Sequence, residues 1–197
     1  MRKNVLDILI ITLTFSCSFS IKTKNKFELS KDEKEIINSF LENELASATY
    51  RYRVNNNIVV IEKTISKKQV LHDYLSLLRN YKESLIDSVQ VIKMNYELEK
   101  EPQYYWKTTD FIIEKLQTQS LEDFKKTIKT EEYFNLPQRI IFHLSVPLII
   151  NDKEAIVSFM SGSGDTGFTS INSGIILMTK NKDEKWIFKR FLGSVYY

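Results

Sequence analysis

A glycine-rich stretch near the C-terminus holds residues whose types and spacing suggest chemistry. Phe159-Met-Ser-Gly-Ser-Gly-Asp-Thr-Gly-Phe168 contains three of the five glycines of this 197-residue chain, spaced as Gly-x-Gly-x-x-Gly. Loops with that spacing bind pyrophosphate at the N-terminus of a helix. The same stretch contains Asp165-Thr-Gly, a tripeptide that supplies one carboxyl group of an acid-protease pair. Each chemistry makes a demand on the flanking sequence.

Neither demand is met. The residues from Phe168 onward run into another strand candidate, Ile175–Lys180, whereas a pyrophosphate loop needs a helix there. An acid protease needs a second aspartate to share a proton, and the chain has no second Asp-Thr-Gly. We therefore predict a long hairpin connection over Ser161–Gly174, and long connections often carry function. The candidate binding residues in it are Asp165, Phe168, Thr169 and Asn172.

The other residues that could take part in catalysis or ligand binding have no pattern that indicates a catalytic site, a metal site or a cofactor site. His72 and His143 lie far apart, and no Gly-x-Ser-x-Gly element is present to position a nucleophile. We interpret Tyr50-Arg-Tyr-Arg53 and Tyr104-Tyr-Trp106 as packing segments rather than ligand platforms. Glu97, Glu99 and Glu101 alternate as they would on the solvated face of a strand.

The N-terminus has the order of an export signal. Met1-Arg-Lys-Asn is basic, Ile8–Phe15 is apolar, and Ser16-Cys-Ser18 is small. The apolar run is shorter than the ~20 residues of a membrane-spanning helix. The only cysteine, Cys17, follows Leu13-Thr-Phe-Ser16, which resembles a loose bacterial lipobox. We predict cleavage before Cys17 and its lipidation; cleavage after Ser18 or Ser20 is the alternative and would leave no anchor.

These features divide the chain into an export signal (1–16), a lipid-anchored tether (17–29) and one domain (30–197). The 28 Lys+Arg and 25 Asp+Glu residues give a net charge of +3, which argues against a nucleic-acid-binding protein. The expected partners are the membrane, through the lipid, and a protein. Without lipidation of Cys17 the chain would be periplasmic or secreted.

Helical patterns fill the first half of the domain. Ser30-Lys-Asp-Glu33 is a capping box before an apolar stripe that ends at Leu45. Ser66 precedes a second helix, and Ser120 a short one over Leu121–Ile128. We also predict a helix over Thr109–Gln117. Residues 89–98 fit both periodicities, and their β-branched side chains favour a strand.

Strand patterns dominate after Pro137. The candidates are Arg139–Ile150, Glu154–Met160, Ile175–Lys180 and Trp186–Tyr196, with shorter ones over Tyr50–Val54 and Ile58–Ile61. Turns at Asn151-Asp-Lys153 and Asn181-Lys-Asp183 separate them. The predicted fold is α+β, with N-terminal helices packed on a C-terminal antiparallel β-meander.

The chain resembles small uncharacterised lipoproteins of Bacteroidota. The resemblance rests on the signal ending near Ser16-Cys17, the strand Val146-Pro-Leu-Ile, the glycine-rich turn and the closing strand Lys185-Trp-Ile-Phe. It covers the signal and the C-terminal strands, and it implies location and architecture but no activity. Ser18-Phe-Ser-Ile-Lys lacks the acidic run that directs some of these lipoproteins to the cell surface. A periplasm-facing anchor in the cell envelope is therefore expected.

We expect a lipoprotein that binds a partner and does not catalyse a reaction. Two alternatives remain: an immunity-type lipoprotein that neutralises a toxin, and a hydrolase whose site is assembled from distant residues. An immunity protein should have a charged face complementary to its target. A hydrolase should have a deep pocket with titratable groups of perturbed pKa.

Lipidation predicts that radiolabelled palmitate is incorporated into the chain in its native host and is lost in Cys17→Ala. The thiol of Cys17 is the only one available for acylation. Equal labelling of the two chains, or labelling of neither, would contradict the prediction.

Overall fold

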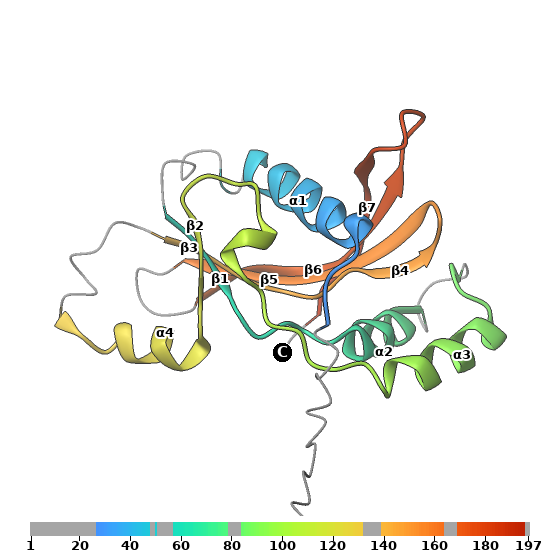
Figure 1. Cartoon of the computed structure of the whole chain (residues 1–197), viewed down its shortest axis with the longest axis horizontal. Helices are drawn as coiled ribbons and strands as arrows, with labels where there is room; N and C mark the ends of the chain where they lie inside the picture. The colour runs from blue at the N-terminus through green and yellow to red at the C-terminus, as the bar shows by residue number, and fades with distance from the viewer. Residues whose placement is uncertain are drawn as a thin grey trace, which may run out of the picture.

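A mixed β-sheet with helices on both faces forms the domain (Figure 1). The computed structural model describes residues 27–47, 50, 57–78, 84–131, 139–163 and 169–195. The predicted export signal, Cys17 and most of the predicted strand Tyr50–Val54 lie outside these residues. None of the described helices has the length and apolar composition needed to cross a bilayer.

The described part of the sheet has seven strands. They are β1 (Asn57–Ile61), β2 (Leu116–Gln119), β3 (Arg139–Leu144), β4 (Leu148–Asn151), β5 (Glu154–Ser163), β6 (Thr169–Lys180) and β7 (Trp186–Gly193). Their order is β2-β1-β3-β5-β6-β7, and β4 pairs with β5. The meander from β3 to β7 is antiparallel, as predicted, and β1 lies parallel to both β2 and β3. The α+β class is confirmed.

The first helix, α1 (Lys31–Ala46), begins at the predicted capping box. Ser30 Oγ accepts a hydrogen bond from the Glu33 N–H at 3.2 Å, and Glu33 Oε2 accepts one from the Ser30 N–H at 2.7 Å. The apolar stripe of α1 is buried against one face of the sheet, around Phe142 and Phe159. Phe27 and Leu29, within the predicted tether, pack on the same core.

The other face of the sheet is covered in two places. α2 (Lys67–Leu78) and α3 (Ser88–Leu98) pack over Ile156 and Ile175, and α4 (Leu121–Thr127) packs through Phe124 over β1 and β3. The predicted caps at Ser66 and Ser120 are confirmed, because both hydroxyls accept a backbone N–H at 3.1 Å. Figure 1 shows α1 on one side of the sheet and the other three helices on the opposite side.

The interpretation of residues 89–98 as a strand is wrong, because they form α3. Asp87 Oδ1 accepts from the Gln90 N–H at 2.8 Å, and Gln90 Oε1 accepts from the Asp87 N–H at 3.0 Å. This reciprocal cap satisfies two helix-terminal donors, so it outweighs the weak strand preference of β-branched residues. The alternating glutamates Glu97, Glu99 and Glu101 therefore do not lie on a strand face.

The helix predicted over Thr109–Gln117 is also wrong. Only Thr108–Asp110 forms a turn of 3-10 helix, and the chain then enters β2. The buried side chain of Asn38 on α1 fixes this segment, donating to Asp110 O at 2.9 Å and accepting from the Ile112 N–H at 2.8 Å. Pairing of β2 with β1 then supplies the hydrogen bonds that a helix would have made.

The glycine-rich connection is shorter than the fourteen residues predicted, because β5 extends to Ser163 and β6 begins at Thr169. Gly174 lies inside β6, where a Cβ would be 2.6 Å from Gly193 O and closer still to the ring of Phe191. This glycine allows close packing of β6 on β7 rather than a turn.

The last strand, β7, is bulged, as the irregular spacing of its aromatic residues suggests. Its register against β6 shifts twice, which leaves Phe188 and Phe191 exposed while Trp186 is buried beside α1. The buried indole is the main contact of β7 with the core.

Trp186→Ala should lower the free energy of unfolding by about 3–5 kcal/mol, because a large buried side chain is lost without refilling of the space. Ile187→Ala, in the same strand at a largely exposed position, is the control and should cost about 1 kcal/mol or less. Chemical denaturation measures both. Equal losses for the two variants would contradict the packing described for Trp186.

Candidate functional site

The structure places one of the four predicted hairpin residues in a polar cluster. Asn172 Nδ2 donates to Glu44 Oε1 on α1 at 3.2 Å, and Ser161 Oγ donates to Asn172 O at 3.2 Å. Tyr50 OH is hydrogen-bonded to Ser161 Oγ. Asp165 and Phe168 lie outside the described residues, and of Thr169 only the pairing with Ser163 in the hairpin is described.

The cluster has the properties of a core contact. Burial raises the pKa of the Glu44 carboxyl, and the hydrogen bond from Asn172 offsets this only in part. Ser161 is fully buried, so its hydroxyl is closed to a substrate. The cluster therefore joins α1 to the base of the glycine-rich hairpin.

The histidines occupy separate places. His72 is exposed on α2, whereas His143 Nε2 donates a hydrogen bond to Lys63 O at 2.9 Å. Burial lowers the pKa of His143, so the ring is neutral at pH 7. Within the described residues, no group of three His, Cys, Asp or Glu side chains has the geometry of a metal site.

A groove of about 560 Å³ lies between α3 and β4. Its α3 wall presents both apolar and charged side chains, and its other wall is the strand itself. The lining residues are Lys67, Gln90, Lys93, Met94, Glu97, Leu98, Lys100, Glu101, Leu148, Ile149 and Ile150. We refer to this feature as the α3–β4 groove.

The groove exists because β1, which pairs with β3, does not continue alongside β4. β3 pairs with β1 on one side and β5 on the other. After a last parallel bridge between Ile65 and Ser145, the chain passes through Pro147 and continues as β4, which pairs with β5 alone. In the described part of the chain, no backbone hydrogen bond reaches the opposite edge of β4. An unpaired strand edge therefore faces α3.

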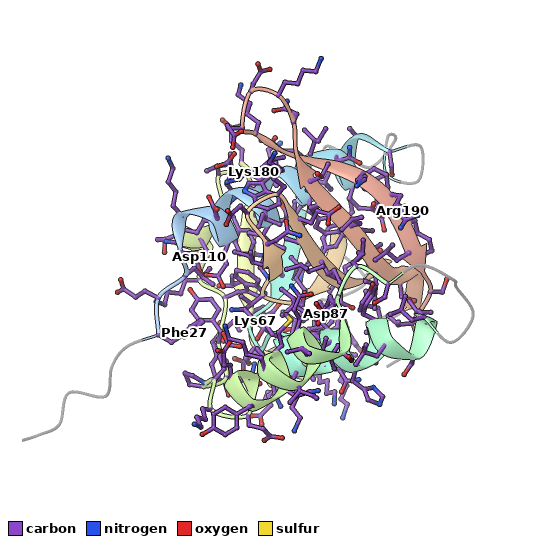
Figure 2. All side chains as sticks on the ribbon, turned by 90° about the vertical axis from the view of Figure 1, so that its right-hand side faces the viewer. Phe27, Lys67, Asp87, Asp110, Lys180 and Arg190 are labelled. Carbon is purple, nitrogen blue, oxygen red and sulfur yellow. The ribbon has the colours of Figure 1, made fainter. Side chains whose placement is uncertain are left out.

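A buried ion cluster closes one end of the groove. Lys67 Nζ, at the start of α2, lies 2.7 Å from Glu33 Oε1 on α1 and 2.7 Å from Glu101 Oε1 just after α3. None of the three side chains is more than 20% exposed. Figure 2 shows Lys67 near Phe27, whose ring centroid is 5.6 Å from Nζ. We call these three charged residues the Lys67 triad.

The environment of Lys67 in the triad does not suit a catalytic lysine. Burial lowers the pKa of Lys67, but the hydrogen bonds and charges of Glu101 and Glu33 outweigh burial, so the pKa lies above its usual value. A lysine nucleophile or general base needs the opposite shift. Lys67 is therefore a permanent cation that joins three helices.

The sequence contained a signal for α3 that the strand interpretation concealed. Val91, Met94 and Leu98 recur at helical spacing, and so do Val89, Ile92 and Tyr96. Two apolar stripes on one helix exceed what a single packing face needs. The role of Lys67 and the open edge of β4 depend on contacts between distant segments, and no local pattern marks them.

Comparison of the chain with protein-family models, with curated proteins and with solved structures gives no match. The resemblance to the Bacteroidota lipoproteins therefore stays a prediction.

Lys67→Met should lower the free energy of unfolding by about 3 kcal/mol, because it leaves two carboxylates facing each other with little solvent. The raised pKa of Lys67 gives the pH dependence its sign. The contribution of Lys67 to the free energy of unfolding is complete below the pKa of lysine in an unfolded chain, about 10.4. This contribution is lost as the pH rises through the higher pKa that Lys67 has in the folded chain.

Lys68→Met is a matched control, since Lys68 pairs with Glu99 and both side chains are more than half exposed. That pair should contribute about 1 kcal/mol or less. Urea denaturation at neutral and alkaline pH measures both variants. A loss in Lys67→Met that is no larger than in Lys68→Met, or that persists unchanged at high pH, would refute the role of the triad.

Proposed function

We propose that the chain is a non-catalytic binding protein held at the cell envelope by a lipid on Cys17, and that the α3–β4 groove binds an extended segment of a protein partner. The anchor follows from the export signal that ends at the only cysteine. The partner site follows from the geometry of the groove.

The observation that carries this proposal is the unpaired edge of β4 facing a helix across an open groove. An exposed strand edge presents N–H and C=O groups at the spacing that an added strand needs. A helix alongside supplies pockets for alternate side chains of that strand. The groove has both a free strand edge, in β4, and a helix alongside it, α3. The backbone groups of β4 would supply the affinity for the partner segment.

The side chains of the groove indicate the kind of segment it favours. Met94, Leu98 and Leu148 offer apolar contact, so the segment should carry apolar residues at alternate positions. Lys67 and Glu101 form an ion pair, so their charges cancel. The other charged residues of the groove lining are two lysines, Lys93 and Lys100, and one glutamate, Glu97. A segment with a modest acidic character fits this balance.

Photo-crosslinking in living cells of the native host tests the site. A benzophenone amino acid at Lys93, on the groove wall, should give a defined adduct with one protein. The same probe at Lys182 is the control, because this lysine is also exposed but lies in the turn between β6 and β7. Adducts from Lys93 and none from Lys182 are expected.

Probes at Asp165 and Phe168 test the hairpin predicted from the sequence as a competing location. Adducts from these two positions and none from Lys93 would move the binding site to the hairpin and refute the groove. Absence of an adduct at Lys93, Asp165 and Phe168 would refute the proposal of a protein-binding function.

A further inference from the structure

The helix α3 has three distinct faces. Val91, Met94 and Leu98 pack on the core, and Gln90, Lys93 and Glu97 line the groove. A turn of ~100° per residue places Val89, Ile92 and Tyr96 on the side away from the core. The groove does not use these three residues.

The outward face is apolar and uncovered in the described structure. Val89, Ile92 and Tyr96 are 73%, 71% and 66% exposed, and they form a continuous stripe at i, i+3 and i+7. No residue of α3 is fully buried, although the helix is firmly capped at Asp87. An apolar stripe on the outside of a surface helix indicates contact with another apolar phase.

The point where the tether enters the domain lies beside the end of this helix. Phe27 and Leu98 line the same small cleft, and Glu101 holds Lys67 next to Phe27. In Figure 2, Phe27 and Lys67 lie at one end of α3 and Asp87 at the other. The nine residues from Ser18 to Lys26 reach at most about 30 Å when fully extended. A chain anchored at Cys17 therefore keeps the C-terminal end of α3 within reach of the bilayer.

The charges around the stripe suit an anionic membrane surface. Lys93 and Lys100 flank it, and Lys100 Nζ lies 3.7 Å from the centroid of the Tyr96 ring. The charge of Glu99, on the other flank, is paired with Lys68. A helix with an apolar stripe bordered by lysines is the kind that lies in the plane of a membrane interface.

We propose that the stripe of Val89, Ile92 and Tyr96 rests on the membrane to which Cys17 is anchored, with Lys100, beside the Tyr96 ring, contacting anionic headgroups. The membrane contact goes beyond the proposed partner site and depends on anchorage at Cys17. It would orient the domain so that α3 lies on the bilayer while the groove stays open along its side.

The test uses the full chain coupled through Cys17 to a maleimide lipid in vesicles of phosphatidylethanolamine and phosphatidylglycerol. Tryptophan reporters are introduced as Ile92→Trp on the stripe and Ile112→Trp as the matched control. Ile112 is 73% exposed and lies beside α1 on the opposite face of the sheet. The unsubstituted chain corrects for Trp106 and Trp186, both of which are buried.

Lipids brominated in their acyl chains should quench Ile92→Trp at least about twofold more than Ile112→Trp, since an interfacial helix buries its apolar face to the acyl boundary. Tyr96→Trp should behave as Ile92→Trp does. Equal quenching at all positions would overturn the proposal. It would also be overturned if a cell extract shields Ile92→Trp from acrylamide and vesicles do not, because the stripe would then bind a protein. The vesicles contain no protein partner, so failure of the groove proposal leaves these outcomes unchanged.

Discussion

The ammonium group of Lys67 is the contact on which the arrangement of the helices depends. It holds a carboxylate from the start of α1 and another from the end of α3, while its own backbone begins α2. Removing one buried partner of such a cluster costs more than the intact cluster contributes, since a lone charge remains in a poorly solvated place. The triad therefore links the positions of the three helices. The same cluster closes the groove and fixes the position at which Phe27 enters the domain.

The groove itself follows from a break in one strand. β3 and β4 both pair with β5, but only β3 also has β1 as a neighbour. Pro147, between them, lacks the N–H group that continued pairing would use. At the other side of the sheet, Thr118 of the short edge strand β2 donates its backbone N–H to Thr108 Oγ1, which blunts the outer edge of that strand. In the part of the chain that the structure describes, α3 lies across the groove from β4.

Elements with local signals were predictable from the sequence, and those set by distant contacts were not. The cap at Ser30, the turns at Asn151 and Asn181 and the C-terminal meander follow from side chains that bond their own neighbourhood. The segment after Asp110 looked helical because its competitor is Asn38, on a different helix. Of the predicted binding residues, Asn172 is a contact to α1. The groove was missed because its two walls are far apart in the chain.

The helix α3 is stabilised by its cap, its inner face and its ion pairs rather than by its exposed apolar stripe. An isolated helix of its length is marginal in water, so its cap, its partly buried inner face and the ion pairs of Glu99 and Glu101 must sustain it. Its outer stripe contributes little to this stability, because those side chains remain exposed. Folding therefore places no demand on Val89, Ile92 and Tyr96 as apolar residues. Under the proposed anchorage at Cys17, even weak contact with the bilayer would stabilise this orientation, since the anchor would supply a high effective concentration. The same contact would hold the groove at a fixed height above the membrane, where a partner segment reaches β4 without competing for the stripe.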